Sequence, residues 1–439
     1  MRTTIIGTFM LRPEMKHRPD SATIAVRAAI ETDTQHGAVI PPLYLSSNFA
    51  FAGYGEKRDY DYTRSGNPTR DDLAVALAEL EGGAGAVITS SGMAALTLLC
   101  HLLKPGDILI APHDCYGGTY RLFENLADKG HFEVLFVDQT DTTAVASACD
   151  RRPKLILTET PSNPLLRIVD IAVMAQFARD CGALLAVDNT FLSPALQNPI
   201  AHGADIVIHS TTKYINGHSD VVGGALIAAT DELTEKLAWW ANCLGITGAP
   251  FDSFLTLRGL RTLHARIRQH EENARLLADV LVGQPQVERV YYPGLPHHTG
   301  HDIAARQQHG FGGMLSFELL GGDSAVRAFL NQLRHFSLAE SLGGVESLVC
   351  HPASMTHAPV NAEALEKAGI TAGLIRLSVG LESVDDLIDD LLSALSTAGN
   401  AATHLASCES YPSSLSASTN DIEDFDSPAT DRTAKRLSA

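Results

Sequence analysis

Several residue types that mark particular protein classes are scarce in this chain of 439 residues. Only seven cysteines occur, they are scattered, and no two form a Cys-x-x-Cys pair. This distribution argues against a disulfide framework or a structural zinc site and predicts free thiols in a reducing compartment. No uninterrupted apolar run is long enough to cross a bilayer, and the first 20 residues show no signal-peptide pattern. We therefore expect a cytoplasmic protein that spans no membrane.

Basic residues are also in the minority. The chain has 33 Lys and Arg against 51 Asp and Glu, which gives a formal net charge of −18. A field of this sign repels nucleic acid and anionic membrane surfaces, so we expect neither as a partner, while a local basic pocket stays open. With 45% hydrophobic residues, the composition is that of a globular protein with a sizeable core.

Short apolar runs alternate with helical patterns from residue 67 onward. Asn67 and Pro68 predict a helix start, and Gly82 predicts the end of that helix. Strands are predicted where apolar, β-rich residues cluster, at residues 108–110, 132–137, 155–157, 184–187 and 206–208. This alternation favours an α/β fold with a mainly parallel sheet covered on both faces.

Shifts in composition divide the chain into four parts. We expect an N-terminal extension and arm (residues 1–60), a large domain (61–256), a smaller α+β C-terminal domain (257–398) and a disordered tail rich in Ser and Thr (399–439). The helical pattern over residues 254–282 predicts one long helix that links the two domains.

Polar residues follow two of the predicted strands at the point where each strand ends. Asp188 follows the run 184–187, and Ser210, Thr212 and Lys213 follow the run 206–208. Such strand ends line the ligand crevice of open α/β sheets, so Asp188 and Lys213 are expected to face one pocket. Taken alone, a carboxylate and a lysine there are as readily a structural ion pair as a catalytic one.

The small-residue turn at residues 90–95 favours the catalytic interpretation. It leads into a predicted helix, whose first backbone N–H groups and positive dipole end bind phosphate. The short hydroxyls of Ser210 and Thr212 suit an anion as well. A lysine that can form a Schiff base, an aspartate for a ring nitrogen and a phosphate cradle are together what pyridoxal phosphate requires.

Seven longer stretches, which cover most of residues 40–398, resemble one family. They include DYTRSGNPTRDD, HDCYGG, ETPSNPLLRIVDIA, AVDNTFLSPALQNP, HSTTKYINGHSD and FSLAESLGGVESL. The chain is similar to the cystathionine γ-synthase branch of the transsulfuration, or Cys/Met metabolism, family of pyridoxal-phosphate enzymes. This resemblance implies a pyridoxal-phosphate-binding large domain of the PLP-dependent transferase type (residues 61–256). It also implies a homotetramer built from dimers with shared active sites.

The resemblance also implies the residues that hold the cofactor, pyridoxal 5'-phosphate. Lys213 would carry it covalently and move protons at Cα and Cβ of the substrate. Asp188 would pair with the ring nitrogen, and Tyr116 would stack on the ring and help to deprotonate the incoming amine. The other implied contacts are Gly92, Met93, Asn163, Ser210 and Thr212, with Tyr62 and Arg64 reaching the phosphate from a neighbouring subunit.

On the substrate side, Arg376 with Ser341 would clamp the α-carboxylate, a task that suits the planar guanidinium. Asp61, Arg121 and Glu340 line this side in similar enzymes. The implied reaction replaces the acyl group of an O-acylhomoserine, with O-succinyl-L-homoserine as the expected donor, by L-cysteine. The product is L-cystathionine, an intermediate of methionine biosynthesis.

One position departs from the synthase pattern. Ser65 stands where bacterial synthases have a second arginine thought to grip the distal carboxylate of a succinyl ester, and it resembles the lyases of the family. An acetyl donor and cystathionine γ-lyase activity therefore stay open as alternatives. Arg121 is the remaining candidate partner for a distal carboxylate.

The histidines at positions 297, 298 and 301 form the one motif that suggests a metal. They lie among prolines and glycines, a composition that predicts an exposed loop. We therefore expect no metal site.

Overall fold

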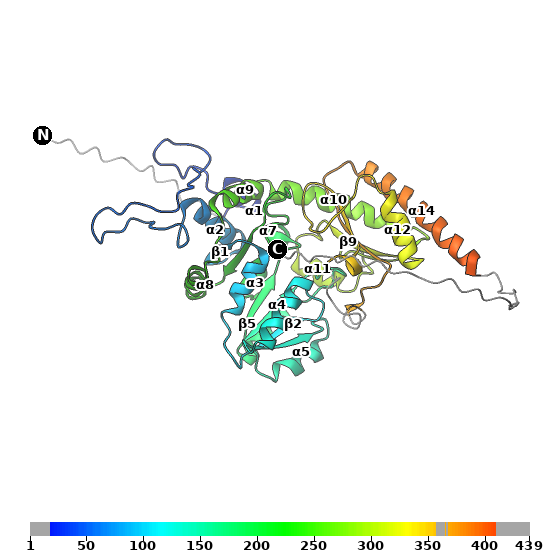
Figure 1. The fold of residues 1–439 in the computed structure, drawn as a ribbon, viewed down its shortest axis with the longest axis horizontal. Helices are drawn as coiled ribbons and strands as arrows, with labels where there is room; N and C mark the ends of the chain where they lie inside the picture. Colours follow the sequence, from blue (N-terminus) through cyan, green and yellow to red (C-terminus); the bar gives the residue numbers. More distant parts are fainter. Residues whose placement is uncertain (1–17, 357–364, 366–367, 410–439) are drawn as a thin grey trace, which may run out of the picture.

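A computed structural model describes residues 18–356, 365 and 368–409 of the chain (Figure 1). Its larger sheet has seven strands: β1 (Gly85–Thr89), β2 (Ile108–Pro112), β3 (Glu133–Val137), β4 (Leu155–Glu159), β5 (Leu184–Asp188), β6 (Ile206–His209) and β7 (Gly224–Ala228). Its smaller sheet has five: β8 (Val287–Tyr291), β9 (Met314–Leu319), β10 (Ser337–Leu338), β11 (Leu348–Cys350) and β12 (Leu374–Ser378).

The helices that precede and cover the larger sheet come first along the chain. They are α1 (Ser21–Arg27), α2 (Pro68–Glu81), α3 (Gly92–Cys100), α4 (Gly117–Asp128), α5 (Thr142–Cys149), α6 (Ile171–Cys181), α7 (Ser193–Leu196), α8 (Asp231–Leu244) and α9 (Pro250–Leu260). The helices that follow are α10 (Leu263–Val282), α11 (His301–Gln307), α12 (Gly322–Gln332) and α14 (Val384–Glu409).

The larger sheet confirms the predicted α/β class. Its strand order is β1-β7-β6-β5-β4-β2-β3, and only β7 runs against the others. Alternate side chains of each strand enter different cores: Leu109 packs in the core that includes α3 and α4, whereas Ile110 packs against α5 and α6. Both faces are therefore buried, which is why these strands appear as continuous apolar runs in the sequence.

The predicted signals at the ends of α2 are confirmed. The Asn67 side chain accepts the backbone N–H groups of Thr69 and Arg70, and Pro68 occupies the first helical position. Gly82 then ends the helix with a φ of 75°, in the left-handed region that favours glycine. These caps fix the position of Glu81, which is fully buried next to His209 at the end of β6.

The expectation of one helix over residues 254–282 is wrong, because α9 ends at Leu260 and α10 begins at Leu263. Arg266 explains the break: its guanidinium donates hydrogen bonds to the carbonyl oxygens of Tyr214, Ile215 and Gly259, at 2.8, 3.3 and 2.8 Å. The Gly259 carbonyl also accepts the backbone N–H of Thr262 at 3.0 Å, a bond three residues ahead, instead of the N–H four residues ahead that would continue an α-helix. No glycine or proline stands at residues 260–263 to signal this interruption.

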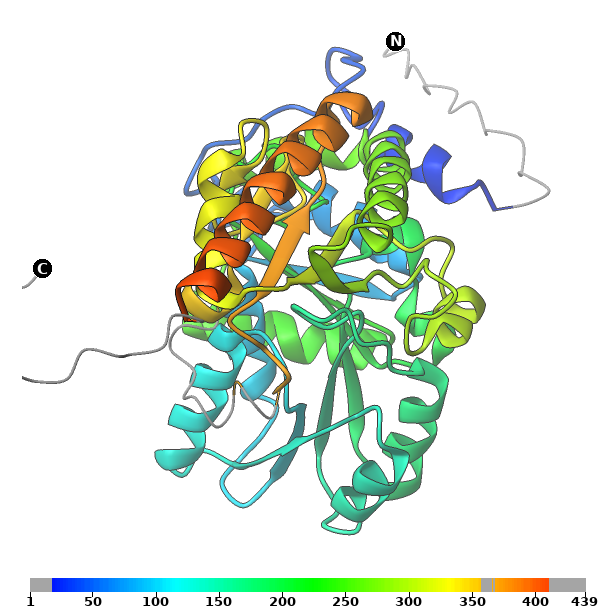
Figure 2. The same ribbon diagram turned by 90° about the vertical axis from the view of Figure 1, so that its right-hand side faces the viewer.

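The smaller sheet has the order β10-β11-β12-β9-β8, and α12 and α14 lie side by side next to it (Figure 2). Helix α14 continues to Glu409, past residue 399, where the sequence analysis begins a disordered tail. Ala401, Ala402 and Leu405 are good helix formers, so a high content of small residues there does not exclude a helix. Residues 410–439 lie outside the described residues, and the four-part division of the chain stays a prediction.

None of the helices in the described ranges is long and apolar enough to cross a membrane.

We expect Gly259→Ala to destabilise the protein, because α9 packs directly on the loop that follows Lys213. A Cβ atom at position 259 would lie 2.1 Å from the carbonyl oxygen of Asn216. This oxygen belongs to the backbone and cannot move aside as the end of a flexible side chain could. The expected loss is roughly 1–3 kcal/mol of unfolding free energy, as for other overpacked sites. Thermal unfolding measures it. Gly283→Ala is the control, since its nearest neighbour is 3.7 Å away; equal melting temperatures for the two variants would contradict the packing argument.

Candidate active site

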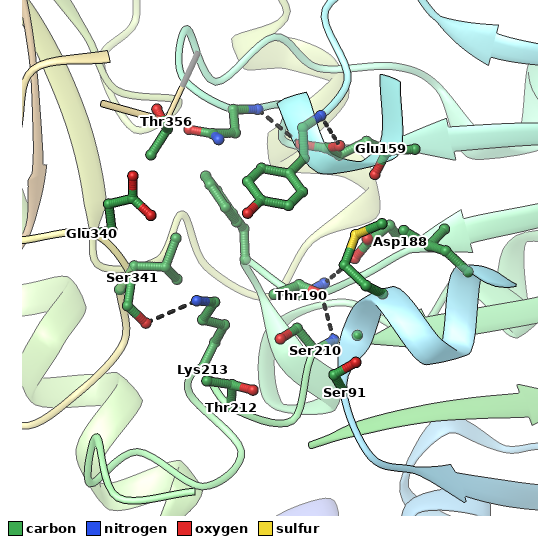
Figure 3. A pocket seen from close by; sticks show the side chains of 18 of the residues that line it. Ser91, Glu159, Asp188, Thr190, Ser210, Thr212, Lys213, Glu340, Ser341 and Thr356 are labelled. Carbon is green, nitrogen blue, oxygen red and sulfur yellow. Dashed lines mark hydrogen bonds between the residues drawn. The ribbon is translucent and has the colours of Figure 1, made fainter. Parts of the chain in front are cut away.

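One cavity of about 390 Å³ lies where the carboxyl ends of the large-sheet strands meet the smaller sheet (Figure 3). Its walls come from the loops after β1, β2, β4, β5 and β6 and from the segments before and within β12. The polar residues that line it are Ser91, Tyr116, Thr119, Glu159, Asn163, Asp188, Thr190, Ser210, Thr212, Lys213, Glu340, Ser341, Thr356 and Arg376. The pocket has the concave form and few convergent polar groups of a small-molecule site.

Asp188 is at the end of β5, and its neighbours in the sheet fix its position. It pairs in register with Glu159 at the end of β4 and with Ile208 of β6. Its Oδ1 accepts the backbone N–H of Thr190 at 3.0 Å, and the Thr190 hydroxyl accepts the N–H of Ser210 at 2.9 Å. Burial raises the pKa of Asp188, although the Thr190 hydrogen bonds and the charge of His209 oppose this shift. A cation that enters the pocket would favour the ionised form of the Asp188 carboxyl.

Lys213 extends into the same cavity from the loop after β6. Its Nζ donates a hydrogen bond to the Ser341 hydroxyl at 2.8 Å (Figure 3). Burial, followed by the positive charge of Arg376, lowers the pKa of Lys213 to about 8, while the charge of Glu340 opposes the change. A large fraction of this amine is therefore neutral near pH 8, the form that attacks a carbonyl group.

The first turn of α3 forms an anion cradle beside the lysine. The Ser91 hydroxyl caps the helix by accepting the N–H of Ala94 at 3.0 Å, which leaves the N–H groups of Gly92 and Met93 without intrahelical acceptors. A Cβ atom at Gly92 would lie 2.8 Å from the Ser210 Cβ, so only glycine allows this close approach. The Thr212 hydroxyl lines the same cavity but already bonds the Gly223 backbone.

Arg376 lies on β12 and is only 2% exposed. Its Nη1 donates to the Asn163 side-chain oxygen at 2.8 Å, and its Nη2 donates to the Ser341 carbonyl at 2.9 Å. Its Nε has no partner among the described residues. Because Arg376 also lines the cavity, its guanidinium can take up a small carboxylate that enters there.

These groups fit pyridoxal phosphate. The donor set contains an amine with a lowered pKa, a carboxyl at the end of the adjacent strand and unpaired N–H groups at a helix start. They can take an aldehyde, a protonated ring nitrogen and a phosphate, respectively. The cavity therefore has one group for each functional part of the cofactor.

Most of the predicted site residues are brought together in this cavity. They are Gly92, Met93, Tyr116, Asn163, Asp188, Ser210, Thr212, Lys213, Glu340, Ser341 and Arg376. Asp61, Tyr62, Arg64 and Arg121 do not line it. Asp61 bonds Lys57, Arg64 donates to the Asn242 carbonyl and side-chain oxygen, and Arg121 is exposed on α4.

The sequence analysis missed four polar residues of the cavity: Thr119, Glu159, Thr190 and Thr356. Glu159 and Thr190 take part in hydrogen bonds with neighbouring loops. Glu159 ends β4 next to Asp188, and Thr190 bonds both Asp188 and Ser210. The signal for Glu159 was present, because it is a charged residue at the end of an apolar strand that runs parallel to β5. Thr190 differs, since a hydroxyl two residues beyond an aspartate has no pattern of its own.

The segment around His298 is a loop with Pro296, His297 and Thr299 exposed, as the sequence analysis predicted, but His298 itself differs from that prediction. His298 is 8% exposed and therefore buried, and burial lowers its pKa to about 4. Within the described residues, no group of three or more His, Cys, Asp or Glu is arranged to hold a metal ion.

The fold and the cavity define a class of protein: an α/β enzyme whose cavity, at the strand ends of its larger sheet, fits pyridoxal phosphate. The model of one family, described as Cys/Met metabolism PLP-dependent enzyme, matches residues 22–396. The chain belongs to this family.

Relatives within the family are close. Cystathionine γ-synthase of Escherichia coli K12 is 58% identical over 371 residues, which cover 84% of this chain and 96% of that protein. The structure of cystathionine γ-synthase from Xanthomonas oryzae pv. oryzae, in complex with aminoacrylate and cysteine, is 62% identical. Its TM-score is 0.87, over 88% of this chain and 100% of that one. Cystathionine γ-lyase of Dictyostelium discoideum is 47% identical over 374 residues, 85% of this chain and 97% of the relative.

We expect Lys213 in the cofactor-free protein to react with an amine-acylating reagent with a pH midpoint of about 8, because burial and Arg376 disfavour its charged form. Mass spectrometry of the digested protein measures the extent of modification at each lysine as a function of pH. The exposed Lys236 provides the comparison rate within the same sample. A Lys213 midpoint above 10 would show that the pocket does not lower the pKa of this amine.

Proposed function

We propose that this chain is a cystathionine γ-synthase, which uses pyridoxal phosphate to replace the acyl group of an O-acyl-L-homoserine by L-cysteine. In the reaction, the Cγ–O bond breaks, a Cγ–S bond forms, and L-cystathionine and a carboxylic acid are released. The observation that carries the proposal is the placement of Lys213 and Asp188 in one cavity with Arg376. The identity of 58–62% to cystathionine γ-synthases supports the choice of reaction. The scattered thiols favour the cytoplasm as its location.

When bound, pyridoxal phosphate supplies an electron sink that weakens the bonds at Cα of an amino acid. We assign proton transfer at Cα and then at Cβ to Lys213, whose amine has a pKa of about 8 and can both take and give a proton near neutral pH. Asp188 would hold a proton on the ring nitrogen by its negative charge. Tyr116, at the start of α4, would contact the ring and take a proton from the incoming amine.

Arg376 and Ser341 hold the α-carboxylate of the amino-acid substrate in this proposal. Arg376 lines the cavity, which supports that task, and the Nη1 bond to Asn163 keeps the guanidinium plane in place. Ser341 bonds Lys213 through its hydroxyl and Arg376 through its carbonyl. Because Ser341 lies between them, Arg376 can bind the carboxylate of a substrate molecule while Lys213 transfers protons on that same molecule.

For the acyl donor, we propose O-succinyl-L-homoserine. Its distal carboxylate needs a cation, and Arg121 on α4 is a candidate because no residue in the described ranges engages its guanidinium. Helix α4 begins at the loop of Tyr116, on the rim of the cavity. Ser65 favours the lyase as a second candidate function, because its hydroxyl bonds Asp61 and the Tyr62 carbonyl and supplies no positive charge.

A comparison of two acyl donors tests both the choice of O-succinyl-L-homoserine and the alternative of a lyase. With cysteine present, we expect the kcat/KM for O-succinyl-L-homoserine to exceed that for O-acetyl-L-homoserine by about 10-fold, the effect of one arginine–carboxylate contact. Arg121→Ala should remove this difference, and Arg327→Ala, at an exposed arginine of α12, should keep it. A preference for the acetyl ester would overturn the donor assignment. Consumption of cystathionine, faster than its formation, would identify a lyase.

We further propose that two chains share each active site. Tyr62 and Arg64 lie outside the cavity of their own chain: Tyr62 pairs with Asn48, and Arg64 donates to Asn242 of α8. The chain between α1 and α2, which leads to them, forms an arm that projects from the large sheet (Figure 1). This arm exposes large apolar side chains, namely Val39, Ile40, Tyr44, Leu45, Phe51 and Tyr54. A cluster of this kind marks a protein interface. In a symmetric dimer, the arm of one chain can bring Tyr62 and Arg64 to the phosphate end of the other cavity, and two such dimers form the expected tetramer.

A mixing experiment tests the shared site. Tyr62→Ala and Lys213→Ala should each be nearly inactive, but mixed chains should regain up to about a quarter of wild-type activity, because each hybrid dimer has one intact site. Tyr62→Ala mixed with Arg64→Ala is the control, since every hybrid site then carries one defect. No recovery in the first mixture, despite exchange of subunits seen by native mass spectrometry, would place each site within one chain.

A further inference from the structure

Glu159 is a buried acid of the cavity that the proposed mechanism leaves without a role. It is the last residue of β4, it is 8% exposed, and it faces Asp188 across the β4–β5 pair (Figure 3). Its Oε2 accepts the backbone N–H of Tyr116 at 3.1 Å, and its Oε1 accepts the backbone N–H of Asn163 at 3.0 Å. One carboxyl therefore ties together two loops that come from different strands.

The two loops carry groups that act in the proposed function. Tyr116 directly precedes α4, and its backbone N–H is held by the bond to Glu159. Asn163 continues the connection, because its side-chain oxygen accepts Nη1 of Arg376 at 2.8 Å. Glu159 thus connects the ring-covering tyrosine on one side with the carboxylate-binding arginine on the other.

A buried carboxyl at this position lowers the stability of the protein, so a purely structural role does not explain it well. Burial and the charge of Asp188 raise the pKa of Glu159, while the two backbone N–H groups oppose the rise. No Lys or Arg in the described ranges forms an ion pair with it. A buried acid without a cation costs stability that a neutral acceptor would not. What only the carboxyl offers here is two equivalent acceptor oxygens, one for each loop.

We propose that Glu159 is a positioning residue, which sets the Tyr116 ring and the Asn163 side chain relative to the bound cofactor through its two hydrogen bonds. The proposal rests on the function given above, because it uses the roles assigned there to Tyr116 and Arg376. It requires both acceptor oxygens, so a side chain that keeps only one of them should leave one loop loose.

The test compares Glu159→Gln and Glu159→Ala with Asp390→Asn in the cofactor-loaded enzyme. Asp390 is a matched control: it is buried and accepts the backbone N–H groups of Arg334 and His335, at 3.0 and 2.8 Å, and none of these three residues lines the cavity. The measurements are the circular dichroism of the bound cofactor in the visible range, divided by its absorbance, the cofactor dissociation constant, and kcat and KM. The dichroism reports how firmly the ring is held, independently of turnover.

For Glu159→Gln we expect a dichroism ratio reduced about twofold and a kcat reduced on the order of 10²-fold, the effect of a misplacement of about 1 Å. The KM for the donor should rise as well, since the Asn163–Arg376 bond loses its support. For Glu159→Ala we expect a larger fall in the dichroism ratio and in kcat, and a larger rise in KM. Asp390→Asn should lower the melting temperature but leave the dichroism ratio, kcat and KM at wild-type values.

Wild-type dichroism and kcat in a folded, loaded Glu159→Gln would overturn the proposal. If both Glu159 variants fail to fold, hydrogen exchange of the wild-type holoenzyme decides instead: the amides of Tyr116 and Asn163 must exchange slowly, and rapid exchange refutes the two bonds. A result that overturns the role of Glu159 can be told apart from a result that overturns the proposed function. A wild type that forms no cystathionine would overturn that function, while the dichroism of its bound cofactor would still test Glu159.

Discussion

The parallel pairing of β4, β5 and β6 is the constraint on which the cavity depends. Because these strands run in one direction and are held in register, Glu159 and Asp188 end side by side, and the chain after Ile208 leaves the sheet beside them. Lys213 follows five residues later, within reach of the same point. A slip of one residue in either pairing would turn Asp188 to the opposite face of the sheet. Backbone hydrogen bonds thus decide which charged groups meet.

The electrostatics of the cavity follow from this crowding. Burial raises the pKa of both carboxyls, Asp188 and Glu159, and lowers that of Lys213, since each charged form loses contact with water. The charge of Arg376 moves the Lys213 pKa in the same direction as burial does. None of these groups is fully neutralised by the others. A ligand that brings a cationic nitrogen toward Asp188 and an anion toward Arg376 therefore relieves both charges at once.

Local signals in the sequence predict much of this arrangement and fail where the cause is tertiary. Asp188 and Lys213 were predictable because each follows a β-rich apolar run, and strand ends of a parallel sheet converge. The same rule applied to Glu159, but the predicted run stopped at residue 157, two residues before the strand ends. The break between α9 and α10 was missed because Arg266, which bonds the Gly259 carbonyl at the end of α9, is also held by carbonyls 51 and 52 positions away.

The second sheet completes the cavity, and the conformation of Ser341 reveals how. Its φ of 84° is unfavourable for a residue with a side chain, so the surrounding contacts must hold it there. The Lys213 amine bonds its hydroxyl, Arg376 bonds its carbonyl, and Gly343 bonds the Ser378 side chain just beyond. All three contacts join the segment before β11 either to β12 or to the loop after β6. The strained serine is therefore the point at which the smaller sheet aligns its arginine with the lysine of the larger one.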